Sequence, residues 1–425
     1  MSDSAIVFEG VTLVDGTGVP PRPDAAVVVE GDKISAVGPV GEVPIPAHGT
    51  RVPCHGLTLL PGLIDAHTHV AEDGYPGALR HLKETTAYAA IRSGVHAARI
   101  LEAGFTTIRD LGSFGLTDVA TKRAIEDGLI RGPRMVVAAH MLVPSGSEED
   151  GYFRPEVATY RVGPERGVAD GPDELRRAVR LQLYHGADLI KVVATGRIYS
   201  DAPGGPWTPT FSLEEVRAVC DEAHRHGAKV AAHAYGAAGI RAAVLAGVDS
   251  IEHGGWIDDD LARGMAGRGV FLVPTFSMLL LAAEHGQGAG LPAPLLDRAG
   301  RIREAHLASF QRALAAGVKI AAGTDCGNPC VFPGRNATEL EYLVEAGLSP
   351  LQAIVSATSA AAELLGLADR VGSITPGRLA DLLLVDGDPL RDISVLQDRS
   401  RIKLVLKGGQ IQRGELPHPS ACESG

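Results

Sequence analysis

The segment GLIDAHTHV, residues 62–70, decides how this chain folds. It opens with a short apolar run and closes with two histidines, His67 and His69. Side chains two positions apart on a β-strand project to the same face, so both imidazoles should point the same way. The segment therefore predicts a buried strand that ends in a pair of candidate metal ligands.

Further apolar runs follow this strand and alternate with Ala-rich amphipathic stretches. We expect strands at 62–70, 105–112, 134–142, 187–196, 228–236, 248–254, 270–277 and 318–326. Helices are expected between them, for example at 213–227 and 303–317, and each of these two ends in a glycine suited to a left-handed C-cap. Strand–helix units in this number predict an α/β fold with a parallel (β/α)₈ TIM barrel, and a doubly wound open sheet is the alternative.

The two ends of the chain have a different texture. Residues 1–61 and 362–425 contain short apolar runs separated by Gly and Asp-Gly turns, which are hairpin signals. Because a barrel leaves both termini free, we expect these ends to pair as a small β-sandwich domain. The catalytic barrel would then span 62–361.

Composition excludes several classes of protein. The net charge is −11 and the basic residues are dispersed, which argues against nucleic-acid binding. No apolar stretch is long enough to span a membrane, and the first residues do not resemble a secretory signal. Five cysteines at irregular spacings do not suggest a disulfide framework, so we expect a cytoplasmic protein. The four-residue step between Cys326 and Cys330 makes a metal site there improbable.

Ionisable residues gather at the expected strand ends, where the active sites of TIM barrels lie. The candidate metal ligands are His67, His69, Lys191, His233, His253 and Asp325. Core packing is a poor explanation for six such residues at the same end of one barrel.

Lys191 is the unusual member of this set, because a buried amine beside histidines is costly. Its presence is explained if the amine reacts with carbon dioxide to give a carbamate, which is a carboxylate on a long stem. Such an N6-carboxylated lysine could bridge two divalent metal ions. Zinc is the first candidate, although the ligand types also suit Mn²⁺ and Co²⁺.

The motifs PGLIDAHTHV, KVVATG, HAYG, SIEHG and AAGTDCGNP occur in the order found in the amidohydrolase superfamily, and the resemblance covers essentially the whole chain. It implies that His67 and His69, with Asp325, bind the more buried metal. His233 and His253 would bind the more exposed metal. Asp325 would also be the general base that moves a proton from a metal-bridging hydroxide to the leaving group.

The residue set also separates subgroups of the superfamily. Deaminase-like members resemble a mononuclear pattern, with no bridging lysine and a Glu shortly after the histidine that corresponds to His233, whereas this chain has HAYGAAGI there and Lys191. Imidazolonepropionase-like members are also mononuclear. The chain most resembles Xaa-Pro and Xaa-Arg dipeptidases, carboxypeptidase-like enzymes and ochratoxin-type amidases, which cut an amide next to a free carboxylate.

Candidate substrate-binding residues are less certain than the metal ligands. Tyr235 matches a residue that contacts substrate near the scissile bond in that subgroup. His140 lies near the end of one expected strand, and Arg197, Tyr199 and Arg335 follow others; all four could line the pocket, where an arginine would pair naturally with a carboxylate. The alternatives are an aromatic packed under a loop for Tyr235 and a plain core histidine for His140.

The sequence therefore predicts a metal-dependent hydrolase in which a metal-bridging hydroxide attacks the amide of a dipeptide or an N-acyl amino acid. The alternative is hydrolysis of a cyclic amide or lactam, as in hydantoinase- or imidazolonepropionase-like enzymes. A non-enzymatic scaffold is disfavoured, because no ligand is missing. The expected partner is a small-molecule substrate, and we expect a homo-oligomer.

Overall fold

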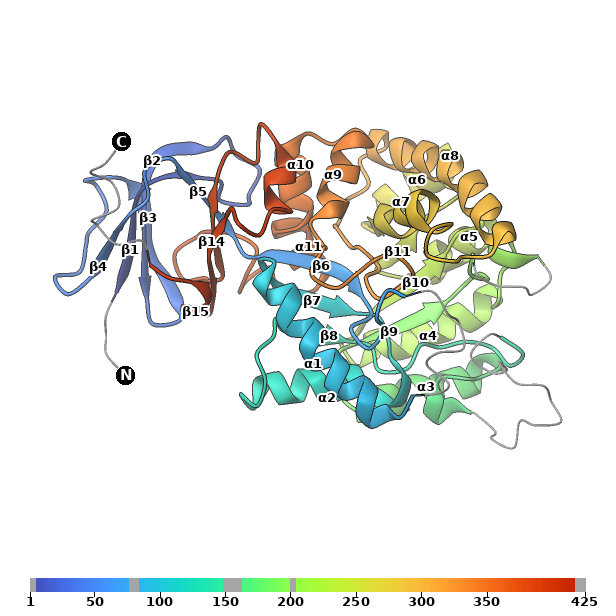
Figure 1. The fold of residues 1–425 in the computed structure, drawn as a ribbon. Helices are drawn as coiled ribbons and strands as arrows, with labels where there is room; N and C mark the ends of the chain where they lie inside the picture. Colours follow the sequence, from blue (N-terminus) through green and yellow to red (C-terminus); the bar gives the residue numbers. More distant parts are fainter. Residues whose placement is uncertain (1–4, 76–83, 148–162, 199–203, 417–425) are drawn as a thin grey trace.

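The computed structural model of this protein describes residues 5–75, 84–147, 163–198 and 204–416. Figure 1 shows two parts, a sheet made from both ends of the chain and a larger part in which strands are surrounded by helices. Among the described residues, no helix is both long enough and apolar enough to cross a bilayer.

The sheet at the chain ends joins segments that are far apart in the sequence. Its eight strands are β1 (Ile6–Leu13), β2 (Arg22–Glu30), β3 (Lys33–Pro39), β4 (Thr50–Pro53), β5 (Leu57–Pro61), β13 (Leu382–Asp386), β14 (Ile402–Lys407) and β15 (Gln410–Gly414). The central pairing is β5 with β13, antiparallel, with Leu59 opposite Leu384. All eight strands are hydrogen-bonded into one sheet, so the predicted pairing of the chain ends is present but a two-sheet sandwich is not confirmed.

The larger part contains parallel strands at the places that the sequence predicts. These are β6 (Leu63–Thr68), β7 (Phe105–Asp110), β8 (Arg134–Val137), β9 (Leu189–Val193), β10 (Lys229–Ala234), β11 (Ser250–His253) and β12 (Phe271–Val273). Nearly every residue in them is buried, as expected for parallel strands that are covered on both faces. The limits proposed between the two domains stay a prediction, although β5 ends at Pro61 and β6 begins at Leu63.

Ring closure is only partly shown by these strands. They form two separate sheets, in the orders β6-β7-β8 and β9-β10-β11-β12. The expected eighth strand, 318–326, is not a regular strand, and it meets its neighbours through single bridges, Leu272 with Ile320 and Thr68 with Cys326. A third bridge, Leu142 with Val192, spans the gap between β8 and β9. The architecture is of the TIM-barrel type, but a continuous eight-stranded ladder is not formed.

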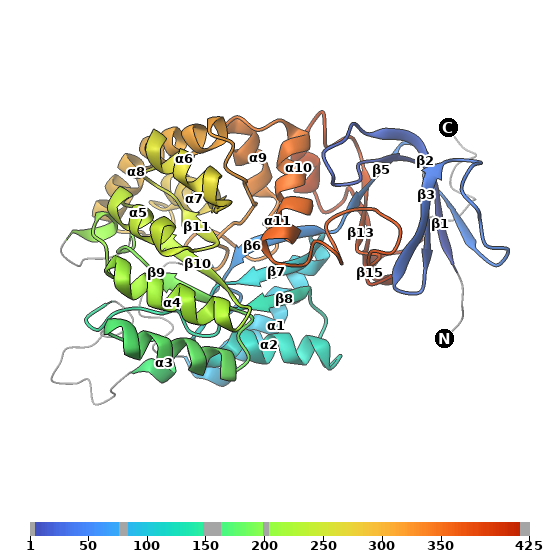
Figure 2. The ribbon, with the colours of Figure 1, turned by 180° about the vertical axis from the view of Figure 1, so that it is seen from behind.

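Helices follow the strands and cover them, as Figure 2 shows for α4 and α5 beside β9 and β10. They are α1 (Thr86–Glu102), α2 (Thr117–Glu126), α3 (Gly171–Tyr184), α4 (Leu213–Arg225), α5 (Ala237–Ala246), α6 (Asp259–Arg268), α7 (Phe276–His285), α8 (Ala293–Ala315), α9 (Thr338–Glu345), α10 (Pro350–Ser356) and α11 (Ser359–Leu364).

Local sequence explains the ends of α4. Ser212 and Glu215 form a capping box at its start, which satisfies backbone N–H groups that the helix leaves free. At its end Gly227 has φ +75°, the left-handed conformation that the sequence predicts. Gly317, after α8, has φ +80° for the same reason.

A buried ion pair connects the barrel strands to the terminal sheet. Asp381 Oδ2 accepts a hydrogen bond from Arg134 Nη1 at 2.7 Å, and Asp381 Oδ1 accepts one from Gly408 N at 2.8 Å. The side chain of Asp381 is 2% exposed. This carboxylate therefore fixes β8 against the turn between β14 and β15.

We predict that Asp381→Ala lowers the free energy of unfolding by about 2–3 kcal/mol, because it leaves Arg134 without its buried partner. Urea denaturation followed by circular dichroism measures the change. The matched control is Asp127→Ala, which removes a surface partner of Arg123 on α2 and should have little effect. Equal destabilisation by both variants would contradict this assignment.

Candidate metal centre

The six predicted ligands come from the ends of neighbouring strands. His67 lies in β6 and His69 directly follows it, Lys191 lies in β9, His233 in β10 and His253 ends β11. Asp325 lies in the segment after α8, and its backbone N–H donates to the His67 carbonyl at 2.8 Å. All except His69 are buried, and the side chain of His69 is only 12% exposed.

Backbone strain is concentrated at these strand ends. His253, Thr275 and Asp325 have φ values of +72°, +54° and +60°. Residues other than glycine rarely adopt this conformation, and a β-branched threonine is especially strained there. The left-handed residue also breaks the alternation of β11, which lets Glu252 and His253 both face the interior although they are adjacent in sequence.

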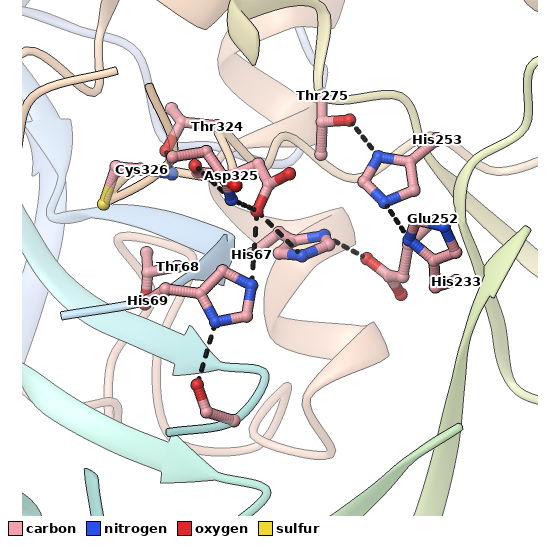
Figure 3. A network of polar contacts seen from close by, with 12 residues as sticks. His67, Thr68, His69, His233, Glu252, His253, Thr275, Thr324, Asp325 and Cys326 are labelled. Carbon is pink, nitrogen blue, oxygen red and sulfur yellow. Dashed lines mark hydrogen bonds and ion pairs between the residues drawn. The ribbon is translucent and has the colours of Figure 1, made fainter. Parts of the chain in front are cut away.

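The first group of donors consists of His67, His69 and Asp325. Asp325 Oδ1 lies 3.3 Å from Nε2 of each histidine, as Figure 3 shows. Asn328 Nδ2 donates to the same carboxylate oxygen at 2.7 Å. Ligand atoms of His67, Asp325 and His253 all lie within 4.8 Å of one another, which is compatible with a bound metal ion.

The hydrogen bond from His69 to a backbone carbonyl determines which of its ring nitrogens carries a proton. His69 Nδ1 lies 2.9 Å from the Gly112 carbonyl oxygen, which can only accept, so Nδ1 must carry a proton. In a neutral imidazole Nε2 is then a lone pair that faces another acceptor, Asp325 Oδ1. Burial lowers the pKa of His69, but Asp325 and Asp110 outweigh burial and raise the pKa overall. Positive charge is therefore favoured between His69 and Asp325.

The second group of donors repeats the pattern with His233 and His253. The Thr275 hydroxyl donates to the Pro274 carbonyl at 2.6 Å and so accepts from His253 Nδ1, 2.7 Å away. His233 Nε2 lies 3.3 Å from the Gly196 carbonyl oxygen, which assigns it a proton as well. The remaining atoms, His253 Nε2 and His233 Nδ1, are lone pairs 2.8 Å apart. A shared cation would relieve this contact, since metal-binding histidines typically have the other ring nitrogen held by such an outer partner.

Protonation states agree with metal binding. Burial, helped by the positive charge of Lys191, lowers the pKa of His67 and His233 well below the usual value, so their rings are neutral. For His253, burial and the neighbouring His233 do the same. Burial alone would raise the pKa of Asp325, but the adjacent His67 and His69 and the amine of Lys191 lower it to about 2. Neutral imidazoles and an ionised carboxylate are the donors that divalent metals prefer.

Lys191 is 2% exposed, and within the described residues its amine makes no hydrogen bond or ion pair. Burial lowers its pKa to about 8, although Glu252 and Asp325 oppose the shift. An amine in this position has given up its hydration without gaining a partner, which is costly unless it is modified or binds something.

Sequence reasoning missed a set of supporting carboxylates. Asp65 accepts hydrogen bonds from His67 N, Thr324 N, Thr324 Oγ1 and Asn336 Nδ2 at 2.6–3.1 Å. The period of two that identified His67 and His69 also places Asp65 on their face, so this signal was available. Nothing comparable identified Glu252, which lies 2.9 Å from His67 Nδ1 and pairs with Arg109 Nη2 at 2.8 Å.

The structure brings only some of the predicted substrate residues to the cluster. The Tyr235 ring is stacked on His253, with centroids 4.7 Å apart and planes at 4°. Arg197 contacts Met141 Sδ at 3.2 Å and is near enough to lower the pKa of His233 and Lys191. Burial, with smaller contributions from Arg166 and His185, lowers the pKa of His140 to about 4, and none of the metal ligands is among the charges that act on it. Arg335 is exposed, and Tyr199 lies outside the described residues.

A barrel-type fold with a buried His–Asp cluster at its strand ends defines a class of metal-dependent hydrolases. The amidohydrolase family model matches residues 58–412, so the chain belongs to the amidohydrolase family. It is a hydrolase that acts on carbon–nitrogen bonds.

Relatives of named activity fall in the predicted subgroup. Ochratoxinase from Aspergillus niger is 33% identical, over 96% of this chain and 86% of the relative. Among solved structures, a Xaa-Pro dipeptidase with methionine bound in the active site is 34% identical, with a TM-score of 0.89 over 96% of this chain and 99% of that one. A prolidase complexed with N-methylphosphonate-L-proline is 31% identical, with a TM-score of 0.84 over 96% and 99% of the two chains.

If a divalent metal ion binds between the facing donor atoms, it should stabilise the folded protein. We predict that zinc added to chelator-treated protein raises the melting temperature in a concentration-dependent way. At a zinc concentration a thousandfold above Kd, the free energy of unfolding should rise by about 4 kcal/mol. Differential scanning fluorimetry measures the shift. His67→Ala should reduce the shift, because it removes a donor from the first group, and His224→Ala, on the surface of α4, should keep it whole. An undiminished shift in His67→Ala would place the metal elsewhere.

Proposed function

We propose that this protein hydrolyses the amide bond of a dipeptide or an N-acyl amino acid with a free carboxylate, using two divalent metal ions, most simply zinc. The observation that carries the proposal is the presence of two separate groups of facing donor atoms, one at Asp325 and one between His233 and His253. Together, the two groups offer the imidazole and carboxylate donors that divalent cations prefer.

We assign Lys191 as an N6-carboxylated residue that bridges the two groups. It exerts an electrostatic influence on His67 in one group and on His233 in the other, so it lies within reach of both. Carbon dioxide adds to the neutral amine only. A pKa of about 8 instead of 10.5 increases that form about 300-fold near neutral pH, which favours the modification.

The bound metals would supply a polarised substrate carbonyl and a water of lowered pKa. The side chains of this protein do the rest. Asp325 is ionised, and Asn328 orients its Oδ1, so that oxygen can accept a proton and return it to the leaving nitrogen. Tyr235, held flat against His253, is the aromatic group placed beside the reacting bond.

The relatives support the choice of substrate. Two similar structures contain methionine and N-methylphosphonate-L-proline, and both of these molecules carry a free carboxylate on the carbon that bears the nitrogen. Arg197 is the candidate partner for that carboxylate in this chain. We also propose a cytoplasmic homo-oligomer.

Lys191→Ala should reduce metal content and lower kcat by orders of magnitude, because the bridge is lost. A short-chain carboxylic acid such as propionate should restore part of the activity by standing in for the carbamate. Elemental analysis and turnover are measured on the same samples, with Lys122→Ala on α2 as the control. Near-normal turnover with unchanged metal in Lys191→Ala would remove the carbamate assignment.

Converting the substrate carboxylate to an amide should lower kcat/KM by about 1.5–3 kcal/mol, the contribution of a hydrogen bond to a charged group. The comparison uses paired N-acyl amino acids and their amides, with a cyclic-amide panel beside them. Tyr235→Phe should shrink the gap if Tyr235 contacts the carboxylate. Equal turnover of acid and amide would instead favour the cyclic-amide alternative.

A further inference from the structure

His253 is a proposed metal ligand with a strained backbone, so neighbouring residues must hold it in place. Its φ of +72° is unfavourable for a residue with a Cβ, so the surrounding structure must maintain it. His306, buried in α8, donates from Nε2 to the His253 carbonyl at 2.7 Å and so fixes the peptide. The orientation of the ring is set separately, by Thr275 Oγ1 at 2.7 Å from Nδ1 (Figure 3).

Thr275 is itself strained, with φ +54°, and it immediately precedes α7. Its hydroxyl does not cap that helix, since it is used between His253 Nδ1 and the Pro274 carbonyl. The first N–H groups of α7 therefore require another acceptor.

Glu339, on α9, supplies that acceptor from a distant part of the sequence. Its Oε1 accepts from Phe276 N at 2.9 Å, and its Oε2 accepts from Ser277 N and Ser277 Oγ, both at 2.7 Å. The carboxyl group is 1% exposed, and burial raises its pKa to about 8, although the hydrogen bonds from Ser277 and Phe276 oppose this shift. Glu339 therefore caps α7 in place of Thr275, whose hydroxyl is used elsewhere.

We propose that Thr275 and Glu339 are positioning residues that together hold His253 in its metal-binding tautomer. Glu339 caps α7, the cap keeps Thr275 in its left-handed conformation, and Thr275 accepts the Nδ1 proton so that Nε2 faces His233 as a lone pair. This inference rests on the proposed second metal between His233 and His253. It predicts an effect on that metal and none on the metal bound by His67, His69 and Asp325.

The first experiment compares Thr275→Val with Thr275→Ser in full-length protein. Valine has the shape and the backbone preference of threonine but cannot accept from His253. We expect the weaker zinc Kd to rise 10- to 100-fold in Thr275→Val, as for other outer partners of metal-binding histidines, while the tighter Kd stays unchanged. Thr275→Ser should restore it. Isothermal titration of chelator-treated protein and the visible spectrum of the cobalt form measure this change in metal binding, and neither depends on enzymatic activity. The matched control is Thr58→Val, a buried threonine in the terminal sheet.

The second experiment asks whether Glu339 acts through Thr275. In Glu339→Gln the amide NH₂ would face N–H donors of α7, so the same weaker Kd should rise. In the double variant the Kd should be no higher than in Thr275→Val alone, because both changes break one chain of contacts. Additive losses, or a loss at the tighter site, would overturn the proposal. If Thr275→Val does not fold, Glu339→Gln carries the test with the same two readouts.

Failure of this inference is distinguishable from failure of the proposed function. Wild-type protein that binds a single zinc ion would contradict the binuclear proposal itself. Wild-type protein that binds two ions, with Thr275→Val binding both at unchanged Kd, would contradict only the positioning roles.

Discussion

Two histidine lone pairs packed against each other, beside a carboxylate packed against two further histidines, are the constraint on which the rest of this structure depends. His253 Nε2 faces His233 Nδ1 because an outer partner holds the proton of each ring on the opposite nitrogen, and Asp325 Oδ1 lies against Nε2 of His67 and His69. Buried lone pairs in such contact are unfavourable without a positive charge between them. The backbone around them is arranged to keep the contact nonetheless, which is what a preformed metal site requires.

Strain and buried charge serve this arrangement. His253, Thr275 and Asp325 occupy left-handed conformations at strand ends, and each makes a hydrogen bond with another element of the fold. Asp65 gathers four donors beneath the first histidine, and Arg109 spans from the Ala66 carbonyl on β6 to Glu252 on β11. The open end of the barrel is therefore built from networks that cross between strands rather than from ligands alone.

Most strands and the metal-ligand candidates could be predicted from the sequence, whereas several supporting residues could not, and both outcomes have physical reasons. The strand period of two placed His67 and His69 together, and buried apolar runs located seven of the eight strands. The segment 318–326 reads as a strand but bends at Asp325, whose φ of +60° no local pattern announces. Glu252 escaped notice because strand alternation turns it away from His253, and the left-handed turn that cancels this is a tertiary effect. Glu339 acts on α7 from more than sixty residues away, so no local signal could connect them. The joining of all eight terminal strands into one hydrogen-bonded sheet reflects long-range strand pairing, which composition does not specify.

The central claim is that this amidohydrolase places one divalent ion in each group of facing donors. The most direct measurement is anomalous scattering at the zinc edge from crystals of the zinc-loaded protein. Two peaks per chain, one bound by His67, His69 and Asp325 and one by His233 and His253, with continuous density from Lys191 Nζ to both, are predicted. A single peak per chain, or two peaks with an unmodified lysine side chain directed away from them, would contradict the account.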